Sequence, residues 1–266
     1  MEAFALLIAA TLNAGTVLAI AALGLLVSER SGVVNLGAEG LMLVAAVSGF
    51  AAAVHSGSDW VALAAGAGAG ALLAALFGLL VIWLNANQYA TGLALSLFGA
   101  GFSAFAGIRY TQERLPERVQ FELPGLAELP FVGPALFRQH PVVYLAIALA
   151  IGLAWWLARS RAGLVLRAVG ESPESAHALG YPVRRIRLAA VVAGGALCGV
   201  AGAYLFGGVT MLQFHLQGQG VDVPSQWLSM LPYLATIVVL VAISRNANWV
   251  RANMPTSLGK PFFPGA

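Results

Sequence analysis

Histidine, cysteine and acidic side chains carry most enzyme chemistry, and in this sequence none of them forms a recognisable catalytic pattern. The four histidines lie far apart in the chain: His55, His140, His177 and His215. The single cysteine, Cys198, lies inside an apolar run, so no Cys/His spacing suits zinc. A phosphate-binding G-x-x-x-x-G-K-[S/T] loop is also absent, because Lys260 is followed by Pro261. The sequence therefore predicts no catalytic residue, no metal site, no cofactor and no ATP hydrolysis by this chain.

A second group of polar side chains lies inside or beside apolar runs, where amides and a hydroxyl could bind a small polar solute. Polar side chains are costly in hydrocarbon and usually face the interior of a helix bundle. For any one of them an interhelical hydrogen bond, worth roughly 0.6 kcal/mol on average, is the alternative. For Glu39, pairing with Arg30 is a further alternative. The candidates for a solute pathway are Asn13, Asn35, Glu39, Asn87, Gln88 and Thr91.

The composition indicates the elements that must position these residues. Of the 266 residues, 59% are hydrophobic and only 9% are charged, with a mean hydropathy of +0.83. Soluble domains carry about a quarter charged residues, so this chain is expected in a membrane. Its apolar runs are long and unbroken, which favours helices over the short alternating strands of a barrel. We expect an all-α, polytopic bundle forming one membrane domain over residues 1–266.

Seven apolar runs are long enough to be expected as membrane spans: 4–27, 36–54, 61–84, 89–108, 142–158, 188–209 and 228–244. Loop 159–187 and the tail from residue 245 are positively charged, which places both in the cytoplasm. Loop 109–140 is neutral and is expected outside, and counting back puts the N-terminus outside as well. A re-entrant segment at 28–39 is the alternative, and it would reverse the N-terminus.

Loop 159–187 is the most distinctive polar stretch. Its six arginines outnumber its two glutamates: Arg159, Arg161, Arg167, Arg184, Arg185 and Arg187 against Glu171 and Glu174. Ser172 can cap a short helix with Pro173 at its first position. Gly180 can end that helix. The pattern predicts a short helix at the membrane surface, while the alternative is a basic loop that only fixes topology.

Several stretches resemble one family. Residues 170–180, G-E-S-P-E-S-A-H-A-L-G, resemble the ATPase-coupling loop of permeases in ATP-binding cassette (ABC) importers for branched-chain amino acids, simple sugars and nucleosides. Residues 29–42, E-R-S-G-V-V-N-L-G-A-E-G-L-M, and 85–95, N-A-N-Q-Y-A-T-G-L-A-L, resemble the nucleoside-type members most closely. The stretches 223–240 and 257–262 also fit, so the resemblance covers nearly the whole chain.

This resemblance implies partners and a place. The expected partners are an ABC ATPase, a second permease, an extracytoplasmic binding protein or lipoprotein, and the lipid of a bacterial plasma membrane, with no nucleic acid. The solute would be a nucleoside or a related small polar molecule, with simple sugars as an option. The residues expected to couple to the ATPase are Gly170, Glu171, Ser172, Pro173, Glu174, Ser175, Ala176 and Gly180. A self-sufficient secondary transporter, a membrane enzyme and a shortened non-transporting scaffold are the alternatives.

One departure from the family pattern follows Ala201. In such permeases a stretch like A-G-A-Y-L leads to an outer loop and another span before a second A-Y-L-F-G-G-like stretch. Here the single stretch 201–208, A-G-A-Y-L-F-G-G, serves as both. We therefore expect an internally shortened member that lacks a loop and a pair of helices. Loss of a pair leaves the tail on the same side of the membrane.

Overall fold

The computed structural model of the chain describes residues 2–110, 121–122, 138–218 and 254–263. Its helices are α1 Glu2–Arg30, α2 Ala38–Ser56, α3 Asp59–Gly78, α4 Gln88–Gly107, α5 Pro141–Arg159, α6 Arg161–Glu171, α7 Pro173–Ala178 and α8 Val183–Gly218. A π-helical turn, η1 Leu79–Trp83, extends α3, and a 3-10 turn, η2 Ile108–Tyr110, extends α4. The strands β1 Phe121–Glu122 and β2 Arg138–Gln139 form a short antiparallel pair.

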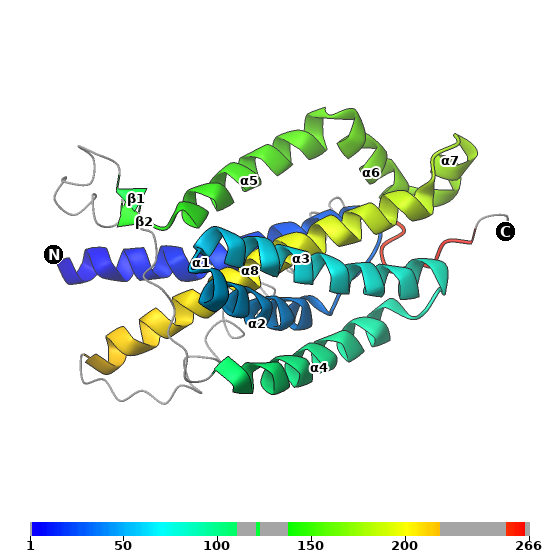
Figure 1. Cartoon of the computed structure of the whole chain (residues 1–266). Coiled ribbons are helices and arrows are strands. Elements are labelled where there is room, and N and C mark those ends of the chain that lie inside the picture. The colour runs from blue at the N-terminus through cyan, green and yellow to red at the C-terminus, as the bar shows by residue number, and fades with distance from the viewer. Residues whose placement is uncertain (1, 111–120, 123–137, 219–253, 264–266) are drawn as a thin grey trace, which may run out of the picture.

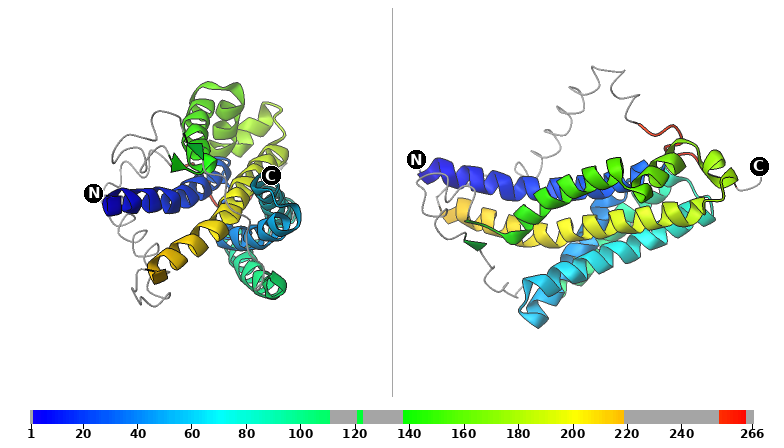
Figure 2. Two further views of the ribbon diagram at one scale, coloured as in Figure 1. Left: turned by 60° about the vertical axis from the view of Figure 1, so that its left-hand side comes forward. Right: turned by 90° about the horizontal axis from the view of Figure 1, so that it is seen from above.

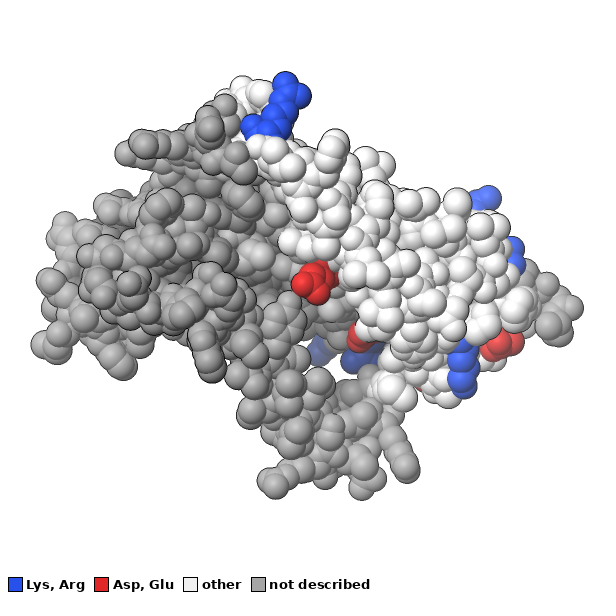
Figure 3. All heavy atoms as spheres, turned by 90° about the horizontal axis from the view of Figure 1, so that it is seen from below, with Lys and Arg blue, Asp and Glu red and all other residues white. Residues whose placement is uncertain are grey.

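Five stretches of these helices are long and apolar enough to cross a membrane: 38–56, 59–83, 88–110, 141–159 and 183–205. α1, with 29 residues, also exceeds the roughly 20 that a crossing needs. On the face seen in Figure 3, uncharged residues cover most of the described surface, as a lipid-facing protein requires. The all-α membrane bundle is therefore confirmed, with helices at the first six expected spans. The seventh, 228–244, lies outside the described residues.

α8 is the central helix of the bundle, and α1, α2 and α3 pack directly against it (Figures 1 and 2). Glycines allow these helices to approach closely. A Cβ atom at Gly24 of α1 would collide with the backbone oxygen of Gly194 in α8, and one at Gly70 of α3 with that of Gly195. Contacts of this kind replace the hydrophobic driving force that lipid cannot supply between helices. Small residues therefore determine how the bundle assembles.

Polar turns from distant parts of the chain meet at one end of the molecule, which we call the α7 end. The backbone N–H of Val34 in the α1–α2 turn donates to Gln88 Oε1 at the start of α4, at 2.8 Å. In the tail, Gly259 N–H donates to the backbone oxygen of Gly32 at 3.0 Å. The start of α4 and the tail therefore hold the α1–α2 turn at this end, and a re-entrant segment at 28–39 stays an alternative prediction.

α5 leans on α1 and leaves an apolar groove of about 320 Å³ between α1, α5 and α8. Leucine, alanine, glycine and tryptophan residues line it, among them Leu23, Trp156 and Leu197. Apart from the indole N–H of Trp156 the lining is apolar, and it contains none of the six residues predicted for the solute pathway.

Candidate functional site

The short helix α7 begins as the sequence predicts. Ser172 has an extended backbone and its Oγ accepts from the backbone N–H of Ser175 at 3.3 Å. Pro173 is the first helical residue, where its missing N–H costs nothing. This local capping explains why the six residues of α7 form a helix of their own after the end of α6.

Gly180 ends the turn after α7. Its φ of +87° lies in the left-handed region that favours glycine. The backbone N–H of Gly180 donates to His177 at 2.8 Å, and that of Tyr181 donates to Ala176 at 3.1 Å. A Cβ atom at Gly180 would have nothing within 4 Å. The need for glycine here is therefore conformational and not a matter of space.

α7 is fixed on one side and open on the other. Ala176 is buried in an apolar cluster with Val169, Val183 and Phe262, and Pro173 is buried too. The outward side exposes Glu174, Ser175, His177, Ala178 and Leu179. Leu179 is 78% exposed. Figure 1 shows α7 at the extremity of the molecule, where a partner could reach this side.

The residues expected to couple to an ATPase therefore fall into two sets. Glu171, Glu174, Ser175 and Gly180 are exposed, and Ser172 is half-buried. Gly170, Pro173 and Ala176 are buried and position α7 instead of facing outward. Glu171 already has a partner within the chain, because its Oε2 accepts from Thr256 N–H at 3.2 Å and from Thr256 Oγ1 at 2.5 Å.

Arg187 is one of the six arginines of loop 159–187, but it is only 2% exposed. Its position explains this, because α8 begins at Val183 and residues 183, 187, 190 and 191 all turn inward. The guanidinium donates from Nε to Ser31 O at 3.1 Å, from one terminal nitrogen to Ser257 Oγ at 3.0 Å and from the other to Lys260 O at 3.3 Å. The helix register was the one signal in the sequence that could have separated Arg187 from its neighbours.

Five of the six solute-pathway candidates gather where α2 and α4 begin. Asn35 Oδ1 accepts from the Gly37 N–H at 2.8 Å, and Gln88 Oε1 accepts from Val34. Asn87 caps α4 by accepting from the N–H groups of Tyr89 and Ala90, at 3.0 and 3.1 Å. These three side chains thus shape local backbone.

The other two members of this group lie in the first turns of the same helices. Glu39 is exposed in the first turn of α2, and Thr91 is half-buried in the first turn of α4. A solute-contacting role for these five residues stays a prediction.

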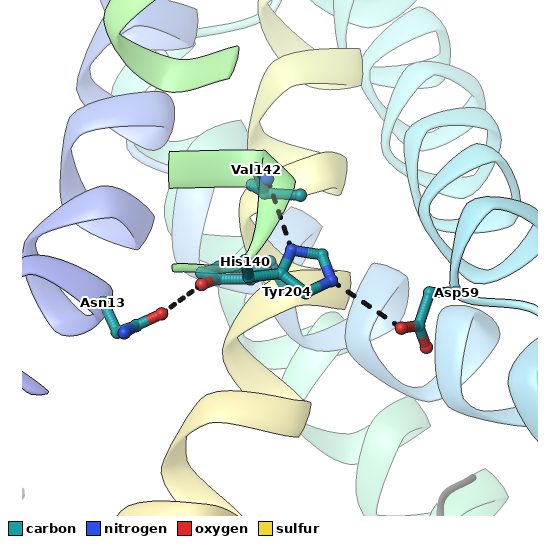
Figure 4. A network of polar contacts seen from close by, with 5 residues as sticks. All are labelled: Asn13, Asp59, His140, Val142 and Tyr204. Atoms are coloured by element: carbon teal, nitrogen blue, oxygen red, sulfur yellow. Dashed lines mark hydrogen bonds and ion pairs between the residues drawn. The ribbon is translucent and has the colours of Figure 1, made fainter. Parts of the chain in front are cut away.

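Asn13 lies apart from this group, in a polar network with Tyr204, His140 and Asp59 (Figure 4). Its Nδ2 donates to Gln139 Oε1 at 2.7 Å, while its Oδ1 accepts from the hydroxyl of Tyr204. His140 lies next to Tyr204, with ring centroids 5.2 Å apart, and its Nε2 is 3.6 Å from Asp59 Oδ2. This network ties the start of α5 to α1, α3 and α8.

Of this network, only Asn13 is predicted from the sequence as a site residue. The other members are separated from it by 46 to 191 positions, and nothing in their local patterns links them. Within the described residues, no group of three His, Cys, Asp or Glu side chains could hold a metal ion.

Comparisons with known proteins point to one family. The profile of the family described as branched-chain amino acid transport system / permease component matches residues 7–247. The candidate glucose ABC transporter permease TsgC13 of Haloferax volcanii is 43% identical over 229 residues, covering 84% of this chain and 68% of that protein. No solved structure gave a significant match.

Two further relatives are named for nucleosides. The guanosine ABC transporter permease NupQ of Bacillus subtilis is 27% identical over 321 positions, covering 100% of this chain and 98% of that protein. The nucleoside ABC transporter permease NupC of Lactococcus lactis is 31% identical over 290 positions, covering 88% and 91%. The alignment with NupQ is longer than the 266 residues of this chain, so that relative has positions that this chain lacks. That these positions follow Ala201 stays a prediction.

Proposed function

Because the chain belongs to the branched-chain amino acid transport system permease family, we propose that it is the membrane-spanning subunit of an ABC importer for nucleosides or related small polar solutes. Its relatives are transport subunits and not enzymes, so ATP hydrolysis belongs to a separate ATPase partner. Permeases of this kind also work with substrate-binding partners. In this chain's assembly we expect a second permease and an extracytoplasmic binding protein or lipoprotein.

The observation that carries the coupling role is the presentation of α7. One side of α7 is buried through Pro173 and Ala176, and the other side exposes Glu174 and Leu179. Such a helix is held firmly by the bundle and can dock into a complementary cleft of a partner. When ATP closes two ATPase subunits, the cleft moves and displaces α7. A bundle with two discrete arrangements then changes the side to which its pathway opens.

Charge supports placing the α7 end in the cytoplasm. Arginines accumulate at this end, on α6 and at the start of α8, and cytoplasmic segments carry such an excess. The polar network around Asn13 and His140 then lies toward the outer face, where a binding protein would deliver solute. The assembly resides in the plasma membrane.

Nucleosides are the favoured solute because two relatives named for them match along 98% and 91% of their lengths. The amides of Asn35, Asn87 and Gln88 and the hydroxyl of Thr91 can bond a base or a ribose without fixing a charge. A simple sugar is the second candidate, since the relative named for glucose has the higher identity, 43%.

The decisive test is reconstitution of the chain in lipid with its ATPase, second permease and binding protein. Guanosine or uridine is expected to raise ATP hydrolysis at least several-fold. The same solute should accumulate inside vesicles that have the binding protein outside and ATP inside. Stimulation by glucose and not by nucleosides would replace the solute assignment. Failure of the ATPase to bind the permease would overturn the coupling role of α7.

A further inference from the structure

The tail segment 254–263, which we call the carboxyl-terminal strap, folds back onto the α7 end. It binds the last turn of α6 by four hydrogen bonds. Ser257 donates from its N–H and its Oγ to Gly170 O, at 3.1 and 2.5 Å. Thr256 donates from its backbone N–H and its Oγ1 hydroxyl to Glu171 Oε2. The strap is therefore attached directly before the cap of α7.

The strap also reaches α7 itself. Phe262 is 6% exposed and packs with Val169, Ala176 and Val183, which belong to α6, α7 and α8. Its ring lies edge-on to His177, with centroids 5.6 Å apart. A displacement of α7 must therefore move the strap or break a well-packed apolar contact.

On its other side the strap holds the α1–α2 turn. Gly259 N–H donates to Gly32 O at 3.0 Å, and Arg187 joins Ser31, Ser257 and Lys260 through three different nitrogens. One buried guanidinium thus ties the start of α8, the strap and the turn together. A planar guanidinium can donate in several fixed directions at once, which a lysine ammonium cannot reproduce.

The α1–α2 turn, the strap and Arg187 are closely packed. A Cβ atom at Gly32, whose φ is +91°, would lie 2.8 Å from Ser257 Oγ and 2.9 Å from an Arg187 terminal nitrogen. Beyond the turn, Val34 donates to Gln88 at the start of α4. Continuous contacts therefore run from α7 through the strap and the α1–α2 turn to the start of α4, where the solute-pathway candidates gather.

We propose that the carboxyl-terminal strap transmits the displacement of α7 to the α1–α2 turn, with Arg187 as the positioning residue that joins the two. This inference rests on the proposed function, in which an ATPase moves α7. It adds that the strap is a moving part of the coupling route and more than a static brace of the fold.

The first measurement needs only the purified permease. In Arg187→Lys and in Ser257→Ala, hydrogen–deuterium exchange of peptides covering 254–263 and 31–37 is expected to be about 10-fold faster than in the wild type. Two matched controls should leave these peptides unchanged: Arg185→Lys, an exposed arginine of the same helix, and Ser48→Ala, whose hydroxyl bonds a carbonyl within α2. Unaltered exchange at 31–37 in both Arg187→Lys and Ser257→Ala would show that the strap does not hold the turn and would overturn the proposal.

The second measurement tests transmission with the ATPase bound and needs no solute. A non-hydrolysable ATP analogue is expected to change exchange at 31–37 in the wild-type complex, and Arg187→Lys should reduce that change at least 5-fold while retaining ATPase binding. Arg185→Lys should respond like the wild type. An equal response in Arg187→Lys, or none in the wild type although the analogue binds, would overturn transmission through the strap. Loss of ATPase binding by the wild type would instead overturn the proposed function, so the two failures are distinguishable.

Discussion

Gly180 and Gly57 form a natural pair for testing the coupling role of α7. Both have positive φ, +87° and +66°, both follow a helix, and neither would have a Cβ contact within 4 Å. An L-residue in this conformation costs roughly 1–2 kcal/mol, so the arginine variants should lose similar stability. We expect Gly180→Arg to insert normally and to lose most ATP-driven uptake, because Gly180 follows α7.

Gly57→Arg, at the opposite end, is the matched control and should retain uptake within about twofold once protein levels are equalised, since its cost in stability is comparable. Uptake in vesicles and ATP hydrolysis are measured for both variants. Wild-type uptake in Gly180→Arg would contradict the assignment of α7 as the ATPase contact.

The residues also show which contacts a sequence can and cannot reveal. The cap at Ser172 and the stop at Gly180 were predicted correctly because both depend on neighbours within a few positions. The bonds of Arg187 to Ser31 and Ser257 span 156 and 70 positions, so no local pattern announces them. From the sequence, Arg187 is expected to be solvated because it lies at the end of a polar loop. Only its position on α8 shows that its side chain points into the protein.

Among the elements, α3 and α8 depend on glycine at selected positions. The run Gly66, Gly68 and Gly70 is typical of close helix packing, but only two of its members face α8. A Cβ atom at Gly70 would meet the Gly195 backbone, whereas one at Gly68 would meet nothing within 4 Å. The sequence indicated close packing and could not name the partner helix.

This difference yields a paired prediction. Gly70→Leu should overpack the α3–α8 contact and cost about 1–3 kcal/mol, because the colliding atoms are backbone and cannot move aside. Gly68→Leu should leave stability nearly unchanged. The unfolding temperature of each detergent-purified variant is measured by heating samples and quantifying the remaining folded protein by size-exclusion chromatography. Equal unfolding temperatures for the two variants would show that α3 does not pack on α8 through Gly70.

For the whole molecule, most of the architecture followed from hydropathy. The five candidate spans agree with the second to sixth expected runs, because long apolar stretches leave few alternatives to a helix in lipid. The length of α8 was not expected. Its 36 residues exceed the roughly 20 of one crossing. That this length results from the loss of an internal pair of spans stays a prediction.

Membrane orientation can be tested on the whole molecule by cysteine labelling, because the only native cysteine, Cys198, is buried. Leu179→Cys and Lys260→Cys place exposed thiols at the α7 end, and Ser56→Cys places one at the opposite end of α2. The arginine excess at the α7 end predicts that a membrane-impermeant maleimide labels Ser56→Cys in intact cells, and the other two only after the membrane is opened. Labelling of Leu179→Cys from outside would reverse the orientation and remove α7 from reach of ATP. Labelling of Lys260→Cys and Leu179→Cys from opposite sides would instead separate the strap from α7, and with it the route proposed for coupling.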